Sequence, residues 1–414
     1  MTSPFEGKRV ALGISGSIAA YKAIDLASKL TQTGAEVDVL MSYGATRFVT
    51  PLSFRSITHR PVITDMFDVN SPNAVEHVAI AKSADILVVA PATAHTIAKL
   101  AFGMADDPIR VTALATTAPL VVAPAMDANM WDHPAVQANA ETLQKRGARI
   151  VGPGKGRLAS GLEGWGRLAE TAEIMGIMAV AMGVNGTLAG KSIVVSAGGT
   201  QEPIDPVRVV SNNSSGKMGY AIAQAARDRG AHVILVTAPT ALPDPPGIET
   251  VHVKTANEMY QAVIGACQKA DAVIMAAAVA DYTPAIPTAQ KLKKTDGSLT
   301  VDLVETRDIL MATPRNVIRV GFAAESTDIL EYAQAKLISK GLELNVANDI
   351  TLPGAGFGSD DNKVTLVDSS GTEELPLMPK YDVAGRILDR LTTLLPTPKV
   401  RRRYHPTPAA KTLL

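Results

Sequence analysis

The chain has 414 residues, of which 46% are hydrophobic and 19% are charged. This composition is too apolar for a disordered chain and matches a globular protein. At roughly 100–200 residues per domain, the length predicts two to four domains. The 40 Lys and Arg residues balance the 40 Asp and Glu residues, so no overall positive field is available to bind nucleic acid or an anionic membrane.

Cysteine content and hydropathy indicate where the protein works. Cys267 is the only cysteine, so no internal disulfide can form, and no Cys/His cluster has the spacing of a zinc site. Residues 1–8 lack a basic region followed by an apolar core, and no apolar run approaches the roughly 18–20 residues that span a bilayer. We therefore expect a soluble cytoplasmic protein in which Cys267 is a small core residue.

Short runs rich in Val, Ile and Leu alternate with helical patterns from residue 9 onwards. The helical patterns include Ile18–Leu30 and a segment from Glu170 to about Ala181, which follows a Gly-rich loop over Gly152–Gly166. This alternation is typical of a parallel sheet with crossover helices. The predicted strands of this part are Arg9–Gly13, Glu36–Met41, Asp85–Ala90 and Pro119–Ala123.

The same alternation starts again after a Gly-rich linker at 183–190. The segment Ala285–Arg307 departs from it and is expected to form an inserted arm or hairpin. We therefore predict an α/β fold with two Rossmann-like three-layer domains, over 1–182 and 191–395, followed by a disordered tail over 396–414. The predicted strands of the second series are Lys191–Ser196, His232–Val236, Asp271–Met275 and Arg319–Phe322.

The first predicted strand leads into Ser15, Gly16 and Ser17 at the start of a helix. Backbone N–H groups and hydroxyls there can bind a phosphate, although such a turn also occurs without a ligand. The loop is not GxGxxG and has no Walker lysine. The next predicted strand ends at Ser42, where a dinucleotide site has an acidic residue for the ribose. FMN therefore fits better than NAD, which disfavours an NAD-dependent oxidoreductase.

Three further motifs accompany this loop: Glu76-His77-Val78, Pro91-Ala92-Thr93-Ala94 and PAMDANMW over 124–131. Together with GISGSIAAYK they resemble the family of flavin-dependent cysteine decarboxylases over about residues 7–180. The resemblance implies that His77 is the acid/base residue beside FMN; a histidine without a function is the alternative. It also implies a substrate site at Asp127, Asn129 and Met130, and FMN contacts at Gly13, Ser15, Gly16, Ser17, Ser42 and Thr93.

The chemistry of that family explains why a flavin is needed. A simple α-carboxylate does not leave readily, because the carbanion has nowhere to delocalise. By resemblance, FMN takes a hydride from the carbon that bears sulfur, which creates a thioaldehyde as electron sink. Carbon dioxide then departs, and the enethiolate is protonated and receives the hydride back. Histidine is the side chain most often used for such proton transfers.

Two residues depart from the family pattern. Asp127 stands where the family has Asn, and a carboxylate there repels a substrate carboxylate unless it is protonated or turned away. Ser160 stands in the substrate-covering loop, where the family usually has the cysteine that protonates the enethiolate, and a hydroxyl is a much poorer acid. The proton donor is therefore left open between Ser160, another group and water. An alternative is that the N-terminal domain is a non-catalytic flavin-binding regulator or assembly scaffold.

The second domain carries a different series of motifs. A long GGTQEPIDPVR loop after its first predicted strand is followed by SNNSSGKMG over 211–219, which opens a helix. Glycines and helix-start amides can approach an anion, whereas the alternative is a Ser-rich N-cap. The second predicted strand again ends without an acidic residue, which argues against a dehydrogenase. Lys336 and Lys340 share one helix face, which in isolation is more often solvated.

In their order and spacing, these motifs together with AAAVADY, KLKK, GFAAE and AND resemble the phosphopantothenate–cysteine ligase family over about residues 190–393. In the bacterial ligases, the carboxylate of 4′-phosphopantothenate attacks the α-phosphate of CTP, and the cysteine amine displaces CMP from the acyl-cytidylate. The resemblance implies that Lys291 stabilises the growing charge, that Asn212 holds the acyl-cytidylate and that Asp281 meets Mg²⁺. The implied nucleotide-binding residues are Ala276, Ala277, Asp281, Lys291, Arg307, Asp308, Ile309, Leu310, Phe322, Lys336 and Lys340.

The two resemblances occur in the order of the bacterial fusion enzymes of coenzyme A biosynthesis. They imply a bifunctional enzyme that ligates cysteine to 4′-phosphopantothenate and then decarboxylates the product to 4′-phosphopantetheine; a ligase alone is the alternative. Family members with isolated domains imply trimers of the flavin domain and dimers of the ligase domain. A threefold and a twofold contact in one chain close into a larger homo-oligomer, for which we expect a dodecamer.

Overall fold

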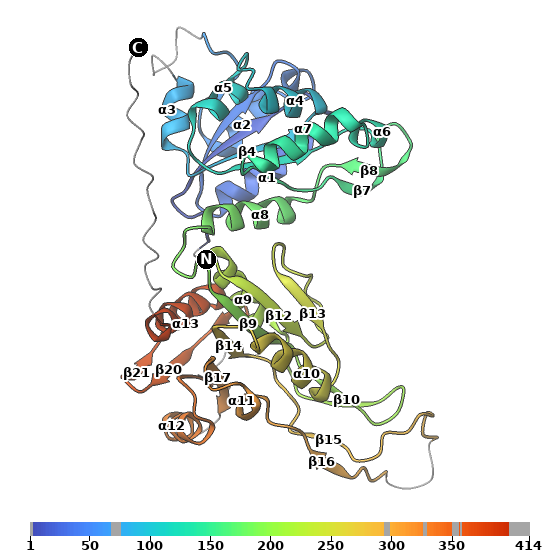
Figure 1. Cartoon of the computed structure of the whole chain (residues 1–414), viewed down its shortest axis with the longest axis vertical. Helices are drawn as coiled ribbons and strands as arrows, with labels where there is room; N and C mark the ends of the chain where they lie inside the picture. The colour runs from blue at the N-terminus through green and yellow to red at the C-terminus, as the bar shows by residue number, and fades with distance from the viewer. Residues whose placement is uncertain are drawn as a thin grey trace, which may run out of the picture.

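The computed structural model describes residues 3–67, 76–293, 299–325, 329–349, 356 and 358–396. Two α/β domains follow one another along the chain and lie one above the other in Figure 1. Residues 397–414, nearly all of the expected tail, lie outside the described residues, as does Lys294 of the KLKK motif. Within the described ranges, no helix has the length and apolar character needed to cross a membrane.

The N-terminal domain is built on six parallel strands in the order β3-β2-β1-β4-β5-β6. The order reverses between β1 and β4, and α/β proteins bind ligands at such a point, beyond the carboxyl ends of the strands. The four strands predicted for this domain are confirmed. The strands are β1 (Arg9–Ile14), β2 (Glu36–Met41), β3 (Val62–Ile63), β4 (Ile86–Ala92), β5 (Leu120–Pro124) and β6 (Arg149–Ile150).

Helices cover both faces of this sheet, and each face has its own hydrophobic core. Side chains of β1 alternate between the two, with Leu12 in one core and Ala11 in the other. The first face carries η1 (Ile18–Tyr21), α1 (Lys22–Gln32), α2 (Pro51–Thr58) and α8 (Thr171–Gly183). The second carries α3 (Glu76–Ser83), α4 (Ala94–Phe102), α5 (Pro108–Ala115) and α7 (Pro134–Lys145).

The segment predicted as a Gly-rich loop over Gly152–Gly166 is an antiparallel hairpin instead. Its strands are β7 (Gly154–Arg157) and β8 (Glu163–Arg167). The prediction is wrong because the segment lacks the alternating β-branched residues by which strands are identified in a sequence.

Glycines let this hairpin lie against the short helix α6 (Ala128–Trp131). A Cβ atom at Gly164 would stand 2.8 Å from the Cβ of Ala128, and one at Gly166 would stand 2.2 Å from the carbonyl oxygen of Met126. The Met126 N–H donates to the Gly166 carbonyl at 3.0 Å. The hairpin is therefore held by backbone contact to the segment that follows β5.

The C-terminal domain has an eight-stranded sheet in the order β13-β12-β9-β14-β17-β18-β20-β21, in which β20 is antiparallel to both neighbours. The four strands predicted for this domain are confirmed. The strands are β9 (Ser192–Ala197), β12 (His232–Thr237), β13 (Glu249–His252), β14 (Ala272–Met275), β17 (Ile318–Glu325), β18 (Leu344–Asp349), β20 (Val364–Asp368) and β21 (Gly371–Glu374).

One face of this sheet packs against α9 (Lys217–Asp228) and α13 (Lys380–Leu394). The other packs against α10 (Ala256–Cys267), α11 (Ile309–Ala312) and α12 (Ile329–Lys340). Two short antiparallel pairs lie beside the sheet. They are β10 (Gln201–Pro203) with β11 (Val209–Ser211), and β19 (Asp361–Asn362) with β22 (Met378–Pro379).

The expected arm leaves the sheet after β14. Its strands β15 (Tyr282–Pro284) and β16 (Leu303–Glu305) pair antiparallel, and Figure 1 shows this hairpin extending from the domain. The inserted hairpin is therefore confirmed. Its far part is tied back where the Leu292 N–H donates to the Asp205 carboxylate at 3.2 Å.

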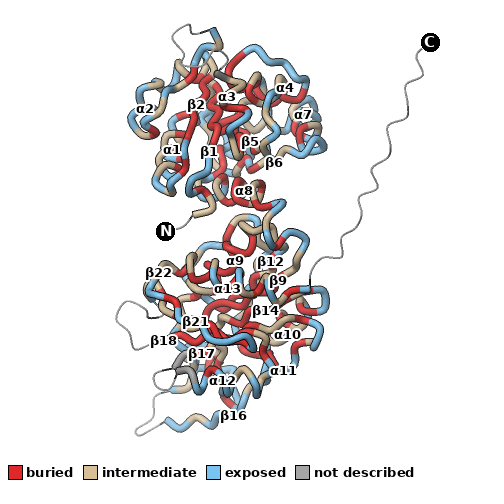
Figure 2. The backbone as a smooth tube through the Cα atoms, turned by 90° about the vertical axis from the view of Figure 1, so that its left-hand side faces the viewer, coloured by how far each residue is buried: buried red, intermediate tan, exposed pale blue. Residues whose placement is uncertain are grey.

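Helix α8 lies between the two domains, as Figure 2 shows. Met178 belongs to the N-terminal core, whereas Gly176 faces the other domain, where a Cβ atom would stand 2.6 Å from the Cβ of Pro246. The segment expected as a linker continues into turns, in which the buried Leu188 donates its N–H to the Arg229 carbonyl at 2.9 Å. The connection is therefore packed against the end of α9.

Candidate functional site

The loops after β1 and β4 meet at the carboxyl edge of the N-terminal sheet. The Ser15 hydroxyl donates to the Pro91 carbonyl at 2.7 Å and accepts the Thr93 N–H at 2.9 Å. Ser15 is 1% exposed. This hydroxyl therefore ties the two loops together, and the FMN contact expected at Ser15 stays a prediction.

Two glycines predicted as FMN contacts, Gly13 and Gly16, lie where a side chain would not fit. A Cβ atom at Gly13 would stand 2.8 Å from the Ile109 side chain of α5, so Gly13 allows β1 to pack closely against that helix, and its expected contact with FMN stays a prediction. At Gly16, a Cβ atom would stand 2.8 Å from the backbone carbon of Gly44. Gly16 therefore allows the loops after β1 and β2 to approach each other closely.

The other predicted contacts, Ser17, Ser42 and Thr93, each accept a backbone N–H from the turn that follows, at 3.2, 3.2 and 3.3 Å. Turns of this kind expose N–H groups that favour an anion. The large apolar side chains exposed near these loops are a feature that the sequence analysis missed. They are Ile18, Tyr21, Tyr43 and Phe48. Such a surface fits a ligand that carries both a phosphate and a flat ring system, as FMN does.

His77 is the second residue of α3, and its side chain is partly buried. Only two residues separate α3 from β4, so the helix runs antiparallel to the strand and begins at the carboxyl edge of the sheet. The topology therefore places His77 at the same edge as the loops after β1, β2 and β4.

The two residues that depart from the family pattern are in direct contact. Asp127 caps α6: one carboxylate oxygen accepts the Asn129 N–H at 3.0 Å, and the other accepts the Ser160 hydroxyl at 2.5 Å. Ser160 lies at the tip of the β7–β8 hairpin, and Asn129 and Met130 are exposed on α6. The Asp127 carboxylate is thus turned toward the hairpin, which the sequence did not show.

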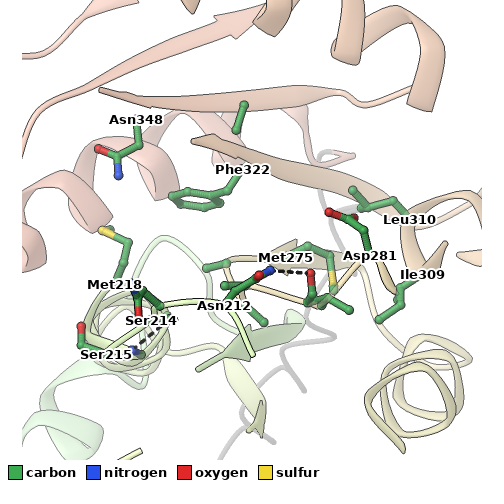
Figure 3. Close-up of a pocket in the computed structure, with 18 of the residues that line it drawn as sticks. Asn212, Ser214, Ser215, Met218, Met275, Asp281, Ile309, Leu310, Phe322 and Asn348 are labelled. Atoms are coloured by element: carbon green, nitrogen blue, oxygen red, sulfur yellow. Dashed lines mark hydrogen bonds between the residues drawn. The ribbon is translucent and has the colours of Figure 1, made fainter. Parts of the chain in front are cut away.

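The C-terminal domain contains a pocket of about 840 Å³ between the start of α9 and the carboxyl ends of β14, β17 and β18. Figure 3 shows Phe322, Asn348 and Met218 around one end of this pocket and Asp281 at the other. Every predicted nucleotide-binding residue except Lys291 lines it, as does Asn212. These lining residues are Ala276, Ala277, Asp281, Arg307, Asp308, Ile309, Leu310, Phe322, Lys336 and Lys340.

The lysine pair of α12 reaches this pocket. The Lys336 ammonium donates to the Phe322 carbonyl at 2.7 Å, and Lys340 forms an ion pair with Asp308, which caps α11. Burial acts to raise the pKa of Asp308, but the hydrogen bonds from Lys340 and the Met311 N–H outweigh it and lower the pKa. The face of α12 that carries Lys336 and Lys340 is therefore a wall of the pocket and not simply a solvated surface.

The pocket has further polar residues that the sequence analysis did not assign. Asn348 is 9% exposed, and its side-chain oxygen has no hydrogen-bond partner among the described residues. Lys380 lies at the same end, where its ammonium donates to the Asp361 carbonyl at 3.2 Å. Burial, together with the nearby Lys217, lowers the pKa of Lys380. The AND motif contained Asn348, but only the fold shows that its amide faces a cavity.

Three other predicted residues are placed as follows. Lys291 is exposed on the arm and is not part of the pocket wall. Asp281 lines the pocket, but no cluster of three or more His, Cys, Asp or Glu side chains that could hold a metal occurs in the described part of the chain. Cys267, the last residue of α10, is 1% exposed in the core, and burial raises the pKa of its thiol to about 11, which confirms it as a core residue.

Two doubly wound α/β domains, each with long loops at the carboxyl edge of its sheet, define the chain as a two-domain protein of the Rossmann type. Residues 2–182 match the flavoprotein family, and residues 188–395 match the C-terminal domain family of DNA/pantothenate metabolism flavoproteins. The chain belongs to the family of bifunctional coenzyme A biosynthesis proteins. It is accordingly an enzyme with a decarboxylase domain and a ligase domain.

Two curated relatives that match nearly the whole chain support this assignment. The coenzyme A biosynthesis bifunctional protein CoaBC of Bacillus subtilis (strain 168) is 46% identical, over 94% of this chain and 97% of its own. The protein of the same name from Escherichia coli (strain K12) is 42% identical over the same shares. A crystal structure of the C-terminal domain of such a protein is 42% identical, with a TM-score of 0.44, and covers 50% of this chain and 97% of its own.

Proposed function

We propose that the C-terminal domain joins cysteine to 4′-phosphopantothenate at the expense of CTP, and that the N-terminal domain decarboxylates the product to 4′-phosphopantetheine with FMN. The observation that carries the ligase assignment is the single pocket in which all but one of the predicted nucleotide-binding residues meet. The relatives are named as bifunctional proteins of coenzyme A biosynthesis, which supports the pairing of the two reactions.

In the ligase pocket we place the triphosphate near the two lysines of α12 and the start of α11. Negative charge grows on the α-phosphate when the carboxylate of 4′-phosphopantothenate attacks. The positively charged ammonium groups of Lys336 and Lys340 stabilise that charge. We place the base between Phe322 and Asn348, because an amide oxygen without a partner can accept the amino group of cytosine. Adenine also has an amino group, so the preference for CTP rests on the family.

Mg²⁺ is proposed to bind through Asp281 together with the phosphates. Magnesium sites in nucleotide enzymes commonly use one or two carboxylates, substrate phosphates and water. Asp281 and Glu305 both line the pocket, so the described residues fit such a shared site, although they do not form a metal site alone.

In the N-terminal domain we place FMN against the loops after β1, β2 and β4, with His77 at the same edge. Bound FMN would supply the hydride acceptor that turns the sulfur-bearing carbon into an electron sink. The chain contributes backbone N–H groups for the phosphate, exposed apolar side chains for the ring system, and His77 as acid/base residue.

These assignments are tested by following both reactions in one purified protein. The wild type is expected to be yellow, to release pyrophosphate from CTP only with phosphopantothenate and cysteine present, and to release carbon dioxide from phosphopantothenoylcysteine. His77→Asn is expected to stop decarboxylation alone, and Lys291→Gln to slow acyl-cytidylate formation alone. A protein that binds FMN and ligates but never releases carbon dioxide would establish the alternative, a ligase with a non-catalytic flavin domain.

The assembly and location remain those expected from the sequence. A dodecamer built from trimeric flavin domains and dimeric ligase domains is proposed from closed symmetry, and sedimentation velocity of the purified protein measures it. We place the enzyme in the cytoplasm, because a chain with one thiol and no disulfide is typical of a reducing compartment.

A further inference from the structure

The proposed decarboxylation needs a proton on carbon. The net reaction converts R–COO⁻ and H⁺ into R–H and CO₂, so each turnover takes one proton from solvent and delivers it to the carbon that loses carbon dioxide. An aliphatic hydroxyl by itself is a very weak acid, and the one thiol of the chain is buried in the other domain. A stronger acid near the Ser160 hydroxyl would solve this problem.

Asp127 becomes such an acid once its carboxylate takes up a proton. The Ser160 hydroxyl donates to the Asp127 carboxylate at 2.5 Å, a length typical of a hydrogen bond between a hydroxyl and an ionised carboxylate. Both side chains have access to solvent, since Ser160 is exposed and Asp127 partly so. The contact links the tip of the hairpin to the segment that leaves β5, at the carboxyl edge where the other predicted site residues lie.

The surrounding backbone fixes this contact. The hairpin is pressed onto α6 through Gly164 and Gly166, and its tip is closed by a turn in which the Leu158 N–H donates to the Leu162 carbonyl at 2.8 Å. Asp127 is held from the other side by its bond to the Asn129 N–H. The two side chains therefore come from segments that are held by backbone contacts on both sides of the pair.

We propose that Asp127 and Ser160 form a proton-delivery pair for the decarboxylase reaction. In this step, which rests on the proposed function, Asp127 first takes a proton from water. The Ser160 hydroxyl gives its proton to the enethiolate carbon and takes the Asp127 proton in return, which regenerates the hydroxyl and leaves a carboxylate. Ser160 is then the catalytic residue, and Asp127 acts through it as the positioning and proton-supplying residue.

The decisive variant is Asp127→Asn, because Asn caps helices as well as Asp does but has no proton of a carboxyl group to transfer. We expect decarboxylation to fall by about 100-fold, with FMN content and ligation unchanged. With substrate present, the visible absorbance of the bound flavin is expected to stay bleached, since the hydride cannot return until the carbon is protonated. Full decarboxylation by Asp127→Asn, beside an active wild type, would overturn the pair.

The same Asp127→Asn change, made in a protein that already carries Ser160→Cys, separates proton supply by Asp127 from a merely structural role. In Ser160→Cys, the thiol is itself an adequate acid, so adding Asp127→Asn is expected to cost less than about threefold, compared with about 100-fold in the serine background. If Asp127 acted only by capping α6, which does not involve Ser160, the loss would be equal in both backgrounds, and the proposal would fail.

A third measurement uses the flavin-free protein. Amide hydrogen exchange over 158–162 is expected to become faster in Ser160→Ala and Asp127→Ala, and no faster in the double variant than in either alone. Unchanged exchange in both would show that the bond does not anchor the tip and would contradict the pair. A wild type that binds FMN but releases no carbon dioxide would instead remove the proposed decarboxylase function, and the pair with it.

Discussion

At the scale of single residues, Asn348 is placed for binding at the expense of stability. A buried amide oxygen without a partner costs the folded protein roughly 1–3 kcal/mol, and Asn348 has such an oxygen on the pocket wall. Asn348→Leu is therefore expected to raise the free energy of unfolding of the nucleotide-free protein by about 1 kcal/mol. It is also expected to raise the KM for CTP by about 10-fold with little change in kcat. Chemical denaturation measures the change in stability, and pyrophosphate release measures the KM and kcat.

Asn345 on the same strand is a matched control. Its side-chain oxygen also lacks a partner among the described residues, but it is fully buried outside the pocket, and its amide N–H donates to the Ala333 carbonyl at 2.9 Å. Asn345→Leu is expected to destabilise the protein, because it leaves that carbonyl without its donor, and to leave the KM for CTP unchanged. A wild-type KM in Asn348→Leu would remove Asn348 from the nucleotide site.

The contacts of single side chains are also what the sequence did not predict. The motifs identified most of the residues that meet in the ligase pocket, because strand ends of a parallel sheet gather at one edge. They did not show what each hydroxyl contacts. Ser15 bonds to a residue 76 positions away, and Ser160 to one 33 positions away. Such partners are fixed by the packing of loops, which leaves no periodic pattern in the sequence.

At the scale of elements, a buried ion pair joins β20 to α13. Asp368 accepts a hydrogen bond from the Arg390 guanidinium at 2.9 Å. Burial acts to raise the pKa of Asp368, but the bonds from Arg390 and Ser370 outweigh it and hold the pKa at about 2. Since an unfolded Asp titrates near pH 3.9, this group stabilises the fold fully above about pH 4, and the contribution is lost as the pH falls toward 2.

Arg390→Met is therefore expected to lower the free energy of unfolding by about 3 kcal/mol at pH 7, because it leaves a buried carboxylate without its partner. The difference from the wild type is expected to shrink as the pH falls from about 4 to about 2. The exposed pair of Arg386 on α13 and Glu373 on the neighbouring strand β21 is the control, and Arg386→Gln is expected to cost less than about 1 kcal/mol. A pH-independent loss in Arg390→Met would contradict the linkage.

Elements differed in how well the sequence predicted them. Strands rich in Val and Ile, such as β1 and β9, were located correctly because a strand that is buried on both faces is a continuous apolar run. The β7–β8 hairpin was missed because it is built from glycines at Gly154, Gly156, Gly164 and Gly166. The close approach to α6 and the residues before it requires Gly164 and Gly166, and no local propensity marks any of the four as strand residues.

At the scale of the whole molecule, α8 joins two cores that fold on different sheets. Its sequence, TAEIMGIMAVAMG, is apolar on every side, as expected for a helix buried all round. Gly176 is one of the points at which α8 closely approaches the ligase domain, because a Cβ atom there would stand 2.6 Å from the Cβ of Pro246. A larger side chain at this position cannot fit without moving the domains apart.

Gly176→Leu is therefore expected to open the contact between the domains while each retains its own core. Protease cleavage within 184–190 is expected to become at least about 10-fold faster, and small-angle scattering to show a larger radius of gyration, with ligation by the C-terminal domain retained. Gly265 in α10, whose Cβ position has no atom within 4 Å, supplies the control: Gly265→Leu is expected to leave cleavage and size unchanged. If Gly176→Leu remained as compact and as resistant as the wild type, α8 would not be the element that fixes the domain arrangement.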